Sequence, residues 1–107
     1  MGYIKHHSII VTTFEKEKAI CARNRALKDF KNLVTPIKKS LINSWYSFAI
    51  LPDGSKEGWA ESNMCDEARE RFNGWLRKNR YKDNSSPYDA VEISFDEEGR
   101  TSIKNIN

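Results

Sequence analysis

The sequence lacks any long run of apolar residues. No apolar stretch among its 107 residues approaches the roughly 18 that a transmembrane helix needs. The charged start at Lys5 is followed by only a short apolar stretch, residues 8–11, before polar residues return. Such a stretch is too short for the hydrophobic part of a signal peptide. We therefore expect a cytoplasmic protein with reduced thiols.

Cysteine and histidine are scarce. Cys21 and Cys65 lie far apart and form no C-x-x-C pair, which argues against a disulfide and against a zinc site. His6 and His7 are adjacent, so in a strand they point to opposite faces. With Ser8 they form an H-x-S of the kind that 2H phosphoesterases use. Those enzymes need a second such motif, and the chain has no third histidine.

Other catalytic signatures are also missing. The sequence contains no G-x-S-x-G nucleophile elbow and no G-x-x-x-x-G-K phosphate loop. Acidic residues between Glu57 and Glu67 surround the expected start of the second helix, where the helix dipole explains them. We predict no enzymatic activity, no cofactor and no metal.

The charged residues that are present are distributed unevenly. Residues 1–44 hold nine basic and three acidic side chains, whereas residues 45–107 hold nine basic and twelve acidic ones. The first part therefore carries +6 and the second −3, within a total of +3. A basic half can meet an anionic partner such as a nucleic acid. It can equally be the solvated face of a helix.

The first half of the chain predicts a strand, a helix and a connection. The β-branched residues within 6–13 favour a strand. Thr12 and Glu15 are spaced as a capping box, which predicts a helix from there to about Phe30. Residues 32–43 read as a connection that contains a short strand or an irregular lead-in.

The second half predicts a hairpin, a helix and further strands. Trp45–Leu51 forms a strand, the turn follows at Pro52, and residues 56–59 form a short return strand. A second helix starts with Ser62 or Asn63 as its cap and ends near residue 78. A strand over 88–95 points Val91, Ile93 and Phe95 inward, and residues 101–106 add an edge strand.

This order of elements predicts an α+β fold in one domain, residues 1–107. The arrangement β-α-β-β-α-β is ferredoxin-like, with two helices on one face of an antiparallel sheet and the other face open.

Trp45 is the residue that packing explains least. Alternation places it with His6 and Thr12 on the open face, while Trp59 packs at the entrance of the second helix. An exposed indole can stack a base or nucleotide, contact a partner, lie in a homodimer interface, or be partly buried. The strand after the turn lacks the aromatic pattern of an RNA-recognition motif.

The first helix supplies the other candidate site residues. Arg23 lies within the apolar arc of that helix, where it either extends past the edge of the core or faces a ligand. Arg25 and Lys28 lie nearby and make the helix basic.

Three tracts of the chain resemble small proteins from phage and bacterial genomes. They are YIKHHSIIVT at 3–12, DGSKEGW at 53–59 and SSPY at 85–88. No activity is attached to those proteins, but the resemblance implies a role in blocking or sequestering a host component. We therefore predict a non-catalytic, phage-type binding protein that occupies a host protein or holds a small anionic ligand such as a nucleotide. The alternative is a nucleic-acid-binding accessory protein that uses the basic half.

Overall fold

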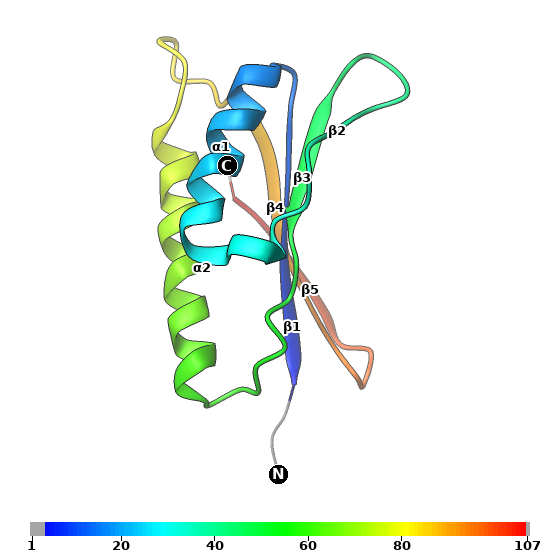
Figure 1. The fold of residues 1–107 in the computed structure, drawn as a ribbon, viewed down its shortest axis with the longest axis vertical. Coiled ribbons are helices and arrows are strands. Elements are labelled where there is room, and N and C mark those ends of the chain that lie inside the picture. Colours follow the sequence, from blue (N-terminus) through cyan, green and yellow to red (C-terminus); the bar gives the residue numbers. More distant parts are fainter. Residues whose placement is uncertain (1–3, 107) are drawn as a thin grey trace.

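Figure 1 shows the computed structural model, which describes residues 4–106. Residues 1–3 and 107 lie outside the described residues, and they include the start of the first tract quoted above. The elements are β1 (Lys5–Thr13), α1 (Lys16–Phe30), the short 3-10 helix η1 (Lys31–Leu33), β2 (Lys38–Lys39), β3 (Tyr46–Ile50), α2 (Ala60–Lys78), β4 (Tyr88–Asp96) and β5 (Thr101–Asn105).

The strands form one antiparallel sheet in the order β2-β3-β1-β4-β5. Both long helices cover the same face, and no helix among residues 4–106 covers the other (Figure 1). The predicted α+β fold, with two helices on one face of an antiparallel sheet, is therefore confirmed. The exact ferredoxin-like order is not confirmed; the observed sheet has five strands in the order given above, with β1 antiparallel to both β3 and β4.

The predicted hairpin between residues 45 and 59 is wrong. β3 is present, but residues 51–56 are irregular and α2 starts at Ala60. The carboxylate of Asp53 accepts hydrogen bonds from both the N–H and the hydroxyl of Ser55. This local bonding competes with strand pairing, and Pro52 has no N–H to offer. β3 instead pairs with β2, which precedes it in the sequence.

Neither predicted helix start forms as expected. Thr12 belongs to β1, where its hydroxyl lies 2.8 Å from that of Ser47, and α1 has no side-chain cap. Glu15 receives a hydrogen bond from the hydroxyl of Tyr81 instead of capping the helix. α2 begins before Ser62, which is buried within the first turn.

The core lies between the helices and the sheet. The apolar stripe of α2 packs there as its spacing predicted, with Ala68, Phe72 and Leu76 buried. α1 contributes alanines, whose small side chains let the helix approach the sheet closely. The remaining large members of the core are Ile9, Val11, Phe30, Val34, Phe48, Ile50, Tyr88 and Ile106. Within residues 4–106, no helix is both long and apolar enough to cross a membrane.

The predicted inward face of β4 is the reverse of the observed one. Tyr88 and Ala90 are buried beneath the helices, whereas Phe95 is 40% exposed on the open face. The register with β1 sets this parity, because Thr13 pairs with Tyr88 and Val11 pairs with Ala90. A shift of one residue exchanges all the side chains of a strand between its two faces. Val91, Ile93 and Phe95 therefore belong to the open face.

Candidate binding surfaces

Beyond a polar row of Ser47, Thr12 and Asp89, the open face of the sheet carries three further rows of side chains in register. One row joins Ala49, Ile10 and Val91, the next joins Ser8, Ile93 and Ile103, and the last joins His6, Phe95 and Thr101. Most of the central positions in these rows are apolar. Alternation within a half-exposed antiparallel sheet normally places polar residues on such a face.

The apolar residues at the β4–β5 side form what we call the ridge: Ile93, Phe95 and Ile103. Ile103 is 73% exposed, and the ring of Phe95 lies 5.1 Å from that of His6 between centroids. Isolated exposed apolar residues are common on proteins, but a contiguous group marks an interaction surface. The ridge lies near the start of β1, because His6 pairs with Phe95.

A second apolar feature lies at the β2–β3 side of the open face. It is a hollow of about 420 Å³, and we call it the hollow. Ile10 and Ala49 contribute its apolar floor, and Lys38 lies at its rim. Its remaining lining residues are Thr35, Pro36, Ser47 and Phe48.

The loop between β2 and β3 presents two bare aliphatic side chains and is here called the tip, Leu41–Ser44. Leu41 is fully exposed and Ile42 is 73% exposed. The hydroxyl of Ser40 donates to the carbonyl of Ile42 and accepts from the N–H of Trp45. In Figure 1 this hairpin stands clear of the rest of the molecule. The tip is therefore a hydrogen-bonded projection with an apolar end.

The structure gives Trp45 a packing partner. Its ring stacks on that of Phe14, with centroids 4.6 Å apart and an angle of 15° between the planes. Trp45 is half-buried, whereas Phe14 is 62% exposed. Trp45 thus lies at the base of the β2–β3 hairpin, at the opposite end of the strands from His6. The predicted open-face residues do not converge on one point.

The basic residues of α1 lie on the other side of the molecule and make internal contacts. Nε of Arg23 donates to the carbonyl of Thr35 at 2.8 Å, which holds the connection before β2. Arg25 lies 3.9 Å from Asp29 in an ion pair. Lys28 is exposed. These positions stay predictions as binding residues, and they are separate from the open face.

A polar network lies beneath α2, on the helix side of the sheet. Nδ1 of His7 lies 3.8 Å from a carboxylate oxygen of Glu92, and Nε2 lies 3.6 Å from Glu57. Asn73, fully buried on α2, donates to Glu92 at 2.9 Å. These contacts tie β1, β4, α2 and the segment before α2 together.

Two groups near α2 have shifted pKa values, Glu92 in this network and Cys65 outside it. Contact with His7 is the main cause that lowers the pKa of Glu92 to about 2, and the amide of Asn73 adds to it. Burial, with hydrogen bonding to Asp53, raises the pKa of Cys65 to about 11. The Cys65 thiol therefore stays protonated at neutral pH and is a poor nucleophile. Within residues 4–106, no three His, Cys, Asp or Glu side chains are arranged to hold a metal ion.

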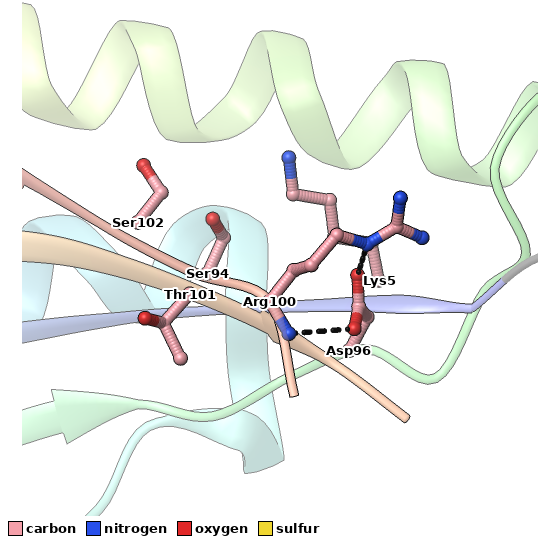
Figure 2. A pocket seen from close by; sticks show the side chains of 6 residues that line it. All are labelled: Lys5, Ser94, Asp96, Arg100, Thr101 and Ser102. Carbon is pink, nitrogen blue, oxygen red and sulfur yellow. Dashed lines mark hydrogen bonds and ion pairs between the residues drawn. The ribbon is translucent and has the colours of Figure 1, made fainter. Parts of the chain in front are cut away.

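A small cavity of about 170 Å³ lies at the β4–β5 turn (Figure 2). The side chains of Ser94 and Ser102 point toward α2, and that of Thr101 points away. The carboxylate of Asp96 accepts hydrogen bonds from the N–H of Glu98 and from both the N–H and Nε of Arg100. This acid therefore holds the turn together.

Comparison with known proteins adds no family assignment: neither a protein-family model nor a curated protein matches the chain.

Two of these surfaces escaped sequence reasoning. Ile93 and Phe95 of the ridge are predicted from the sequence to point into the core, because the alternation looks the same for either face of a strand. The tip fell within a segment read as a connection. The adjacent pair Leu41-Ile42 between polar residues was the signal that could have drawn attention to it.

Proposed function

We propose that the chain is a small non-catalytic binding protein that docks on a partner protein through the ridge. The supporting observation is the contiguity of Ile93, Phe95 and Ile103 on a face that no helix of residues 4–106 covers. Interface cores are enriched in aromatic and apolar residues and depleted of charge. An apolar surface of this kind favours a protein partner over a small anionic ligand.

The class of partner comes from the resemblance to phage and bacterial proteins. By that analogy the partner is a host component such as a defence enzyme, and the chain acts by occupying it. The side chains beneath α2 support a non-catalytic role, because Glu92 is engaged by His7 and Asn73 and the pKa of Cys65 is raised.

Nucleic-acid binding through the basic half remains the second hypothesis. Arg23 and Arg25 both have partners within the protein, which leaves fewer cations of α1 free for phosphates. Binding of this kind weakens steeply as salt rises, so salt dependence separates it from docking through the ridge.

The test compares two matched surface substitutions in protein recovered from its source host. Ile103→Asp places a charge on the ridge, and Met64→Asp places one on an equally bare residue of α2, which is 67% exposed. Native mass spectrometry should show a retained protein partner with the wild type and Met64→Asp. We expect Ile103→Asp to weaken that complex at least about 10-fold, because a charge is then buried in an apolar contact.

Photo-crosslinking supplies an independent measurement. A photoreactive residue at position 103 should crosslink to the same partner, and one at position 67 on exposed Glu67 should not. The proposal is wrong if Ile103→Asp retains the partner as well as the wild type does, or if the chain retains only nucleic acid in a salt-sensitive manner.

A further inference from the structure

The tip and the hollow are two apolar features that lack partners among residues 4–106 and complement each other. One is a projection that ends in Leu41 and Ile42, and the other is a recess floored by Ile10 and Ala49. We propose that the chain forms a two-fold homodimer in which the tip of each copy enters the hollow of the other. This inference concerns a different surface from the ridge and stands without the proposed function.

The tip is already shaped for insertion. Ser40 fixes the loop through hydrogen bonds of 2.6 and 2.8 Å, and its backbone is closed further by a 2.7 Å bond from the N–H of Ser40 to the carbonyl of Trp45. Asn43 and Ser44 hold left-handed conformations with φ of 66° and 52°. Two consecutive left-handed residues are the geometry of a tight hairpin turn. A preorganised loop loses little conformational entropy on binding.

The hollow has the size and character that two aliphatic side chains require. The hollow is an open groove of about 420 Å³, larger than the enclosed cavity of about 150 Å³ that accommodates benzene. Ile10, on its floor, is 39% exposed and would be covered by the insertion. The tip itself carries no charge, and the charges nearest to it in the sequence are those of Lys38 and Lys39 on β2.

The positions of the two features suit a closed dimer. Both lie at the β2–β3 edge of the sheet (Figure 1), so a two-fold axis that crosses the strands between them would place each tip over the hollow of the other copy. The interface is then isologous and contains the same contact twice. The ridge lies toward the other end of the strands, near His6, and is left uncovered by this arrangement.

The contact is smaller than a standard protein interface, so we expect a dissociation constant in the micromolar range. Sedimentation velocity from about 1 µM to about 100 µM should show the purified chain passing from monomer to dimer. Leu41→Asp combined with Ile42→Asp removes the tip, and Ala49→Arg fills the hollow. Each variant alone should weaken dimerisation at least about 30-fold, because each loses both copies of the contact.

Mixing the two variants is the decisive measurement. A heterodimer of the tip variant and the hollow variant keeps one intact contact, so it should form at least about 10-fold more tightly than either variant does alone. Met64→Asp and Ile103→Asp should dimerise like the wild type. Circular dichroism checks folding, and Ile10→Arg replaces Ala49→Arg if the latter unfolds.

Three results would overturn the dimer: a wild type that stays monomeric at about 100 µM, a tip variant that dimerises normally, or a mixture that forms no heterodimer. A failure of this kind leaves the ridge hypothesis standing, because the ridge is tested by Ile103→Asp. Conversely, loss of partner binding with normal dimerisation separates the two surfaces.

Discussion

Glu92 shows how a single side chain can tie several elements to one another. Its carboxylate accepts a hydrogen bond from the buried Asn73 of α2 and lies within ion-pair range of His7 on β1. Oδ1 of Asn73 and Nδ1 of His7 have no hydrogen-bond partner among residues 4–106. A buried polar network that is incompletely satisfied is sensitive to the loss of any one member. Its stability should therefore depend on the ionised state of Glu92.

The free energy of unfolding should contain an acid-sensitive contribution from Glu92. The pKa of this group is lowered from 4.5 to about 2 in the folded state, chiefly by His7. The contribution is therefore complete above the ordinary pKa and is lost as pH falls through the folded value. A pKa change of this size corresponds to about 3 kcal/mol. Urea titrations of the wild type and of Glu92→Gln across this range should show the difference between them shrinking as pH falls.

The matched control is Glu70→Gln. Glu70 is exposed and pairs with Lys104 at 3.3 Å, so its removal should change the free energy of unfolding little at any pH. A pH dependence that is identical in the wild type and Glu92→Gln would contradict the role given to this carboxylate.

At the scale of elements, β4 carries an aromatic residue on each of its two faces, and the two residues differ in burial. Tyr88 is 2% exposed, lies 6.0 Å from Trp75 between ring centroids, and donates its hydroxyl to the carbonyl of Lys18. Phe95, on the opposite face, touches His6 and solvent. The two aromatic residues of one strand therefore contribute unequally to stability.

Truncation of these two aromatic side chains measures that difference. Tyr88→Ala should lower the free energy of unfolding by about 3–5 kcal/mol, because it opens a cavity in the core. Phe95→Ala should cost less than about 1 kcal/mol, since it removes a half-exposed ring. Thermal or urea unfolding of both variants checks this. Equal losses would mean that Phe95 is covered in solution.

Sequence reasoning succeeded where the spacing of the apolar residues fits only one type of element. The stripe Ala68, Phe72 and Leu76 has a 3.6-residue period that only a helix satisfies, and α2 follows it. β3 likewise keeps Phe48 and Ile50 on the core face.

Sequence reasoning failed where two local solutions were equally good. β4 alternates on both faces, and only its pairing with β1 selects which one is buried. Residues 51–56 stay irregular, with Asp53 hydrogen-bonded locally to Ser55, and no return strand follows. Of the candidate site, the open face was foreseen through His6, Thr12 and Trp45. The apolar residues of this face and the exposed tip were not predicted.

At the scale of the whole molecule, the strands of the sheet differ in how well they are protected from pairing with other chains. β1 is hydrogen-bonded to neighbours on both sides, whereas every residue of β5 is exposed at the edge. β2, at the opposite edge, contains only two residues. Very short edge strands limit unwanted pairing with other chains, so β5 is the more vulnerable edge.

Amide hydrogen exchange should follow this order. The amides of β1 should exchange only through global unfolding, while those of β5 should exchange through local opening at much lower free energy. Exchange measured by NMR on the purified chain checks this. Protection of β5 equal to that of β1 would show that another chain covers this edge.

The central place of β1 also constrains how the protein reaches its fold. β1 is synthesised before α1, yet its longest ladder is made with β4, which follows α2. Its register joins Lys5 to Asp96 and Thr13 to Tyr88, so these contacts span most of the chain. Contacts between residues distant in sequence slow folding, because loop closure must precede them. While the chain emerges from the ribosome, only the β1–β3 half of the sheet can assemble, and the core beneath β4 closes last.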